Sequence, residues 1–154
     1  MAIEFIVEDN TGLANATSYL SVADFKQYWE NRGILLIEVD TTYQAWLNEA
    51  TYFIDNNFNF CGKKLTEDQA LKFPNTIYDE VPKQVKNALC EIAYSRQADA
   101  SLSFIQSGIK SKKIGSVSIT FQSMSKSDIK KQYSAAYIQL RQICQVSNKY
   151  VIRV

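Results

Sequence analysis

The sequence contains no histidine and only two prolines, five glycines and three cysteines among its 154 residues. Without histidine, the commonest general base and metal ligand of proteins is missing, as is any Ser-His or Cys-His nucleophile pair. There is also no CxxC pair, no Walker-type phosphate loop and no GxGxxG motif. We therefore expect an interaction protein rather than an enzyme, with no cofactor and no metal site.

The cysteines and the N-terminus narrow the class of protein further. Cys61, Cys90 and Cys144 are odd in number and far apart, which favours buried thiols in a reducing compartment over a disulfide framework. The N-terminus carries no basic segment, and the longest strongly apolar run is only Ile34 to Ile37. We therefore expect neither a signal peptide nor a membrane span.

The composition, with 46% apolar and 21% charged residues, is typical of one globular domain of this length. The charge is unevenly distributed. Residues 1–107 contain eight basic and fifteen acidic residues, whereas residues 108–154 contain nine basic residues and one acidic residue. Such asymmetry is typical either of contact with nucleic acid or of subunits whose opposite faces attract one another.

Apolar residues at helical spacing predict four long helices and place the chain in the mainly α class. In the first helix Ser21 is a capping residue, Asp24 completes a capping box and Gly33 ends the helix. Pro82 stands near the start of the third predicted helix. The predicted fold is a small helical bundle of about four helices with a β-hairpin and an extended C-terminal tail. The helices are expected at residues 21–33, 42–56, 82–100 and 127–146.

Residues 109–121 predict the β-hairpin. Val117, Ile119 and Phe121 alternate with polar residues after a turn at residues 115–116, so these three residues are expected to face the core.

Six lysines lie in this hairpin or shortly after it. Lysines on an edge strand discourage edge-to-edge pairing, and they equally suit contact with phosphate. Sequence-tolerant single-strand binding adds aromatic stacking platforms, for which only Phe104 and Tyr133 are available nearby. The signal for a single-strand groove is therefore weak, while edge protection and phosphate contact both stay open as interpretations of the six lysines. They are Lys110, Lys112, Lys113, Lys126, Lys130 and Lys131.

The C-terminal segment is β-prone and apolar except for two basic residues. Two interpretations stay open: the segment adds a strand to a partner's sheet edge, or it pairs within its own subunit. We expect a single helical domain over residues 1–148 and an extended tail over residues 149–154. The tail residues are Lys149, Tyr150, Val151, Ile152, Arg153 and Val154.

Six blocks in a fixed order carry a resemblance over about residues 4–121: "NATSYLSVADFKQYWENRG", "ATYFID", "FCGKK", "QALKFPN", "VPKQVKNA" and "GIKSKKIGSVSITF". Together they resemble the tailed-phage head-tail adaptor (connector) proteins, a group often labelled DnaT-like ssDNA-binding protein. The usual Trp-Pro-Arg block of that group is here Phe73-Pro74-Asn75, which keeps the aromatic residue and the proline turn and loses the arginine.

This resemblance implies a structural protein of the bacteriophage virion neck, present in the host cytoplasm during assembly. It implies a homo-oligomer, a dodecameric ring, that docks under the portal protein and extends the DNA channel toward a downstream tail component, without a membrane. Residues 149–154 would then bind the portal or a neighbouring subunit. The six lysines would face a neighbour or make non-specific contact with passing double-stranded DNA. The alternative is a single-stranded DNA-binding protein of phage replication.

Overall fold

The computed structural model describes residues 2–98, 111–114, 117–120 and 134–151. These residues form four helices and two short strands. The mainly helical class with four helices is therefore confirmed. Among the described residues, no helix combines the length and the apolar character needed to cross a bilayer. The elements are α1 (Val22–Glu30), α2 (Asp40–Asn57), α3 (Lys83–Ala98), β1 (Ser111–Ile114), β2 (Val117–Thr120) and α6 (Ser134–Val151).

Helix α1 begins and ends on the residues that the sequence indicates. The Ser21 hydroxyl accepts a hydrogen bond from the Asp24 backbone N–H at 3.1 Å, which satisfies one of the free donors of the first turn. At the other end Gly33 adopts a φ of 75°, the left-handed conformation that glycine enters without a steric penalty. The Ile34 N–H then donates back to the Trp29 carbonyl at 3.0 Å and closes the end of the helix.

Valine and proline precede α2 and α3, so neither helix begins with a side-chain hydrogen bond like the one that Ser21 makes at the start of α1. The Val39 carbonyl accepts from the Thr42 N–H at 3.0 Å, so α2 begins at Asp40, two residues before the predicted start. The Pro82 carbonyl accepts from the Lys86 N–H at 3.2 Å, so the proline stands directly before the first residue of α3. This position suits proline, because no N–H is needed there.

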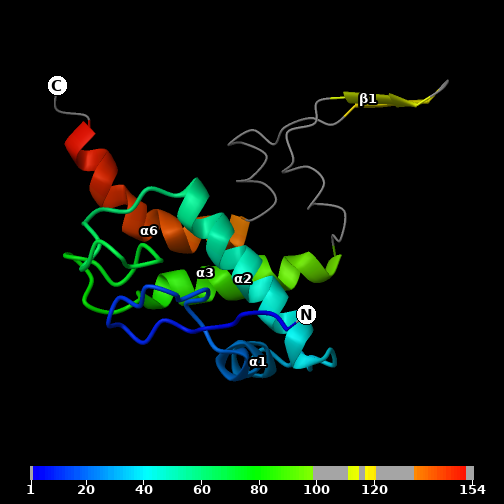
Figure 1. Ribbon diagram of the computed structural model, residues 1–154, viewed down its shortest axis with the longest axis horizontal. Coiled ribbons are helices and arrows are strands. Elements are labelled where there is room, and N and C mark those ends of the chain that lie inside the picture. Colours follow the sequence, from blue (N-terminus) through cyan, green and yellow to red (C-terminus); the bar gives the residue numbers. More distant parts are fainter. Residues whose placement is uncertain (1, 99–110, 115–116, 121–133, 152–154) are drawn as a thin grey trace.

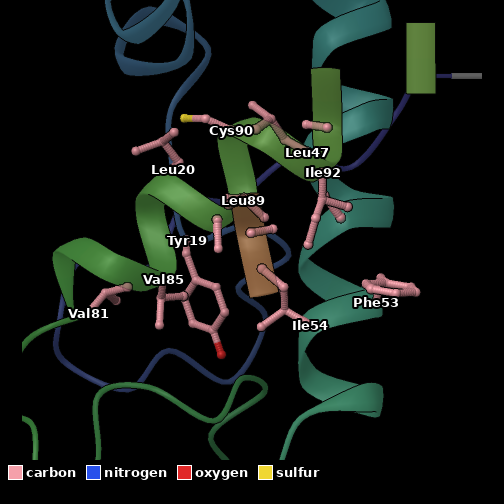
Figure 2. Close-up of a cluster of buried hydrophobic side chains, with 14 of the residues drawn as sticks. Tyr19, Leu20, Leu47, Phe53, Ile54, Val81, Val85, Leu89, Cys90 and Ile92 are labelled. Atoms are coloured by element: carbon pink, nitrogen blue, oxygen red, sulfur yellow. The ribbon is translucent and has the colours of Figure 1, made fainter. Parts of the chain in front are cut away.

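The core lies where α2, α3 and α6 pack together, and α1 packs against α2. Helix α6 contributes Ala136, Leu140 and Ile143 to it. Figure 2 shows the cluster, with Tyr19 from the segment before α1 among the residues of α2 and α3. Most of the free energy that holds the helices together comes from this burial, at roughly 25 cal/mol per Å² of apolar surface.

Strands β1 and β2 pair antiparallel, with Lys112 opposite Ile119 and Ile114 opposite Val117. The turn at residues 115–116 and the remainder of the hairpin predicted over residues 109–121 lie outside the described residues. The complete hairpin and its packing against the core therefore stay a prediction.

The prediction of an extended C-terminal tail is wrong for Lys149, Tyr150 and Val151, because the backbone of α6 stays helical through Val151. Each residue added to an existing helix gains one backbone hydrogen bond, and neither glycine nor proline interrupts residues 134–151. A β-prone composition is a weaker preference than this continuation. Ile152, Arg153 and Val154 lie outside the described residues.

Candidate nucleic-acid interface

A long loop, residues 58–82, joins α2 to α3, and a buried glutamine fixes part of its path. The Gln69 Nε2 donates to the carbonyls of Leu71 at 2.7 Å and Pro74 at 2.8 Å. Its Oε1 accepts from the Leu65 N–H at 3.0 Å. Residues 66–71 contain a turn and no helix. The Gln69 side chain serves the loop backbone in place of helical hydrogen bonds.

Asn75, in the position of the expected arginine, also holds the loop. Its side chain is buried, and its Oδ1 accepts from the N–H groups of Ile77 and Tyr78, each at 2.9 Å. Its Nδ2 donates to the Cys61 carbonyl at 3.2 Å. Gly62 lies so close that a Cβ atom there would stand 2.7 Å from the Asn75 Oδ1. Position 75 of this chain therefore stabilises the loop from inside.

The loop is attached to the core through Tyr19 and Asp55. The Tyr19 hydroxyl donates to the Asp55 Oδ1 at 2.7 Å, and the Lys72 N–H donates both to the Tyr19 hydroxyl at 3.0 Å and to the Asp55 Oδ2 at 3.2 Å. Burial raises the pKa of Asp55 above its usual value of 3.8. Burial, and then the neighbouring carboxylate, raises the pKa of Tyr19, so this phenol stays neutral. The pair is a structural anchor.

This anchored loop presents a cluster of aromatic rings and one lysine, which we name the Phe-Lys cluster: Phe58, Phe60, Lys72 and Tyr137. The rings of Phe58 and Phe60 are half-buried and lie 6.5 Å apart with an interplanar angle of 26°. The Lys72 Nζ lies 5.8 Å from the centre of the Phe60 ring and donates to the Phe58 carbonyl at 2.9 Å. Tyr137, from α6, lies 6.2 Å from Phe58. The cluster thus joins the loop to the first half of α6.

Three further basic residues lie close to the Phe-Lys cluster in the chain: Lys63, Lys64 and Arg141. Lys63 and Lys64 follow Phe60 closely in the chain, and both are exposed. The Lys64 Nζ donates to the Gln69 carbonyl at 2.8 Å. Arg141, also exposed, follows Tyr137 by one helical turn on α6. Positive charge beside aromatic rings that are only half-buried is a combination that suits single-stranded nucleic acid.

A second aromatic cluster lies between α1 and α3 and differs in charge. The Arg32 guanidinium lies 3.7 Å from the centre of the Tyr28 ring, and the Trp29 ring lies 4.2 Å from that of Tyr94. The Tyr28 hydroxyl, however, donates to the Glu91 carboxylate at 2.8 Å. Asp24 and Glu30 on α1 add negative charge, which repels phosphate. The Phe-Lys cluster is therefore the better candidate.

The site residues predicted from the sequence are only partly described. Lys112 and Lys113 lie in β1, and Lys149, Tyr150 and Val151 form the last residues of α6. Lys110, Lys126, Lys130, Lys131, Ile152, Arg153 and Val154 lie outside the described residues.

Sequence reasoning missed Phe58, Phe60, Lys72 and Tyr137. One signal was available, because Phe58 and Phe60 alternate with asparagines directly after α2 and stand just before Lys63-Lys64. Aromatic residues at alternate positions of a polar loop have less reason to be buried than the same residues on a helix stripe. Tyr137 lies beside the buried Ala136 in α6, and the structure leaves it half-buried.

Over the described parts of the chain, no group of three or more acidic or cysteine side chains is arranged to hold a metal ion. The sequence profile of one family, described as "Putative DnaT-like ssDNA binding protein", matches residues 3–154. The chain belongs to this DnaT-like family. No curated protein and no solved structure shows a significant match.

This match corrects the identification made from the sequence blocks. The family is the DnaT-like one, and its description names a single-strand binder rather than a head-tail adaptor. The expected adaptor ring in the virion neck, docked to a portal, is therefore wrong. The sequence blocks misled because the group that they resemble carries two descriptions, head-tail adaptor and ssDNA-binding protein. The uneven charge could not decide between these, since it suits DNA contact as well as subunit assembly.

Proposed function

We propose that this protein binds single-stranded DNA without strong sequence preference, and that the Phe-Lys cluster is a stacking platform of its binding surface. The observation that carries the proposal is the half-buried pair of Phe58 and Phe60 with the Lys72 amino group 5.8 Å from the Phe60 ring. Its placement in a chain of the DnaT-like ssDNA-binding family supports the same function.

The physical argument rests on what a single strand offers. Unpaired bases expose their faces and stack on aromatic rings, which contributes about 1–3 kcal/mol per base. The phosphates bind lysine and arginine through charge alone, and this contact needs no particular base. The hydrogen bond from the Lys72 Nζ to the Phe58 carbonyl holds this amino group beside Phe60.

The basic C-terminal third extends this surface beyond the cluster. Tyr137 and Arg141 belong to α6, which contains two of the nine basic residues of this segment, Arg141 and Lys149. We propose no catalytic step and no cofactor for this function.

Phe60→Leu tests the proposal, because it removes the aromatic ring on which a base would stack. Leucine keeps most of the apolar volume that packs on Phe73, and the ring centres of Phe60 and Phe73 lie 4.7 Å apart. Binding of a fluorescent oligothymidine would be followed by anisotropy at low salt. We expect an affinity about fivefold to a hundredfold weaker, as lost stacking requires.

The matched control is Tyr52→Leu, because Tyr52 is an aromatic residue of α2 that is 68% exposed and lies outside the cluster. This variant should bind as the wild type does. Unchanged binding by Phe60→Leu, in a protein whose thermal unfolding matches the wild type, would contradict the assignment of the cluster. Failure of the wild type to bind the oligonucleotide at low salt would contradict the function itself.

A further inference from the structure

A further half-buried aromatic ring, Tyr78, lies at the edge of the Phe-Lys cluster. Its ring packs on that of Phe73 with 5.8 Å between the centres and an interplanar angle of 64°. The Phe60 ring packs on the same Phe73 ring, at 4.7 Å and 61°. Phe73 is completely buried, whereas Phe60 and Tyr78 are only partly buried. Phe73 therefore connects two rings that both reach the surface of the loop.

The backbone that carries Tyr78 is tied to the segment that follows Phe60. The Thr76 N–H donates to the Lys63 carbonyl at 2.9 Å, and the Lys63 N–H donates to the Thr76 hydroxyl at 3.0 Å. Asn75 holds both backbone groups of Tyr78, because its side chain accepts from the Tyr78 N–H and its own N–H donates to the Tyr78 carbonyl, each at 2.9 Å. Tyr78 therefore keeps a fixed place beside this segment before any ligand binds.

The hydroxyl of Tyr78 and the charges near it suit the end of a bound strand. Among the residues that the structure describes, this hydroxyl makes no hydrogen bond, so it can donate to a phosphate oxygen or to a base. Lys63, in the neighbouring segment, is exposed and attracts phosphate. Asp79 and Glu80, which follow Tyr78 directly, are also exposed and repel phosphate. A strand bound along the loop would therefore leave the protein surface at Tyr78.

We propose that Tyr78 is a second stacking position of the single-strand surface, so that one base stacks on Phe60, another base of the same strand stacks on Tyr78, and Lys63 contacts the phosphate backbone between them. This inference rests on the proposed function and defines its ligand as a run of at least two unpaired nucleotides. Duplex DNA is a poor ligand for such a site, because paired bases hide their faces in the stack.

Fluorescence anisotropy of a labelled oligothymidine at low salt tests the second position. Tyr78→Leu removes the ring and should weaken binding about fivefold to a hundredfold, as the loss of one stacked base requires. Tyr78→Phe keeps the ring and should bind more tightly than Tyr78→Leu. The matched control is Tyr94→Leu, because Tyr94 is also half-buried and packs on a buried ring, that of Trp29, at 4.2 Å. This control should bind as the wild type does.

Two further measurements separate stacking from a structural role of Tyr78. The losses of Phe60→Leu and Tyr78→Leu should add in the double variant, because each ring holds a different base. Tyr78→Trp serves even if the leucine variant fails to fold, since its fluorescence should fall when oligothymidine is added, whereas that of Tyr94→Trp should not.

The outcomes distinguish this inference from the function on which it rests. If the wild type and Phe60→Leu behave as proposed above, unchanged binding by a folded Tyr78→Leu overturns the second position alone. So does a Tyr78→Phe variant as weak as Tyr78→Leu, a double variant no weaker than either single variant, or an unchanged fluorescence of Tyr78→Trp. A wild type that binds no oligothymidine at low salt overturns both.

Discussion

The hydroxyl of Tyr19 joins the segment before α1 to the carboxylate of Asp55 on α2, with 2.7 Å between the oxygens. The same hydroxyl accepts the backbone N–H of Lys72, 53 residues away in the sequence. One phenol therefore holds three parts of the chain at the base of the loop that carries the Phe-Lys cluster.

Tyr19→Phe should destabilise the fold by about 1–3 kcal/mol, because the Asp55 carboxylate and the Phe73 N–H lose a buried partner while the ring remains. Chemical denaturation at neutral pH measures the change. Tyr52→Phe, at an exposed position of α2, is the matched control and should leave the free energy of unfolding unaltered. Equal stabilities of Tyr19→Phe and the wild type would show that the hydroxyl contributes nothing.

Asp55 should make the free energy of unfolding decrease with rising pH. A salt-bridged carboxylate, whose pKa is lowered on folding, has the opposite effect. The pKa of Asp55 is raised in the folded state, so the folded protein binds more protons than the unfolded one between the ordinary value of 3.8 and the raised pKa. The free energy of unfolding should therefore fall as pH rises through that window and then stay level. Denaturation of the wild type and of Asp55→Asn across acidic pH measures the difference, which should be largest at the acidic end. A difference that grows with rising pH would contradict the raised pKa.

Gly62→Ala should destabilise the loop by about 1–3 kcal/mol. Gly62 has a φ of 100°, which a residue with a Cβ rarely adopts, and the added carbon would meet the Asn75 Oδ1 at 2.7 Å. Thermal unfolding measures the loss. Gly33→Ala is an informative comparison, because its φ of 75° is also positive but its Cβ would meet nothing within 4 Å. The Gly62 variant should be the less stable of the two, and the reverse order would mean that the contact with Asn75 does not matter.

Lys63→Gln should reduce the salt dependence of oligonucleotide binding. If Lys63 contacts a phosphate, the slope of log affinity against log salt should become shallower by about 0.7, the value for one contact on a single strand. Lys83→Gln, at the exposed start of α3, removes a lysine away from the cluster and should leave the slope as it is. Identical slopes for both variants would place Lys63 outside the interface.

Features set by neighbouring residues were predictable from the sequence. The Ser21 cap, the left-handed Gly33 and the apolar stripe of α3 depend on contacts within a few residues, and the structure agrees with each. The helical class follows from such stripes, because a buried face of period 3.6 has few other solutions.

The loop of residues 58–82 was not predictable in the same way. Its path depends on single polar contacts between distant residues, such as the Val81 N–H on the Asn10 Oδ1, which are 71 positions apart. No periodicity encodes such a contact. The candidate site was missed for the same reason, since Phe58 and Tyr137 meet only after α2 and α6 have packed on α3.

The buried hydrogen bonds of Gln69, Asn75 and Tyr19 have a consequence for how a flexible ligand binds. A loop of this length would ordinarily lose conformational entropy when a strand settles on it. Here the loop backbone around Phe60 is already fixed in the free protein, so in the proposed complex the entropy lost on binding would belong almost entirely to the DNA. Association should therefore proceed with little rearrangement of the protein and be limited by how fast the strand finds a preorganised surface.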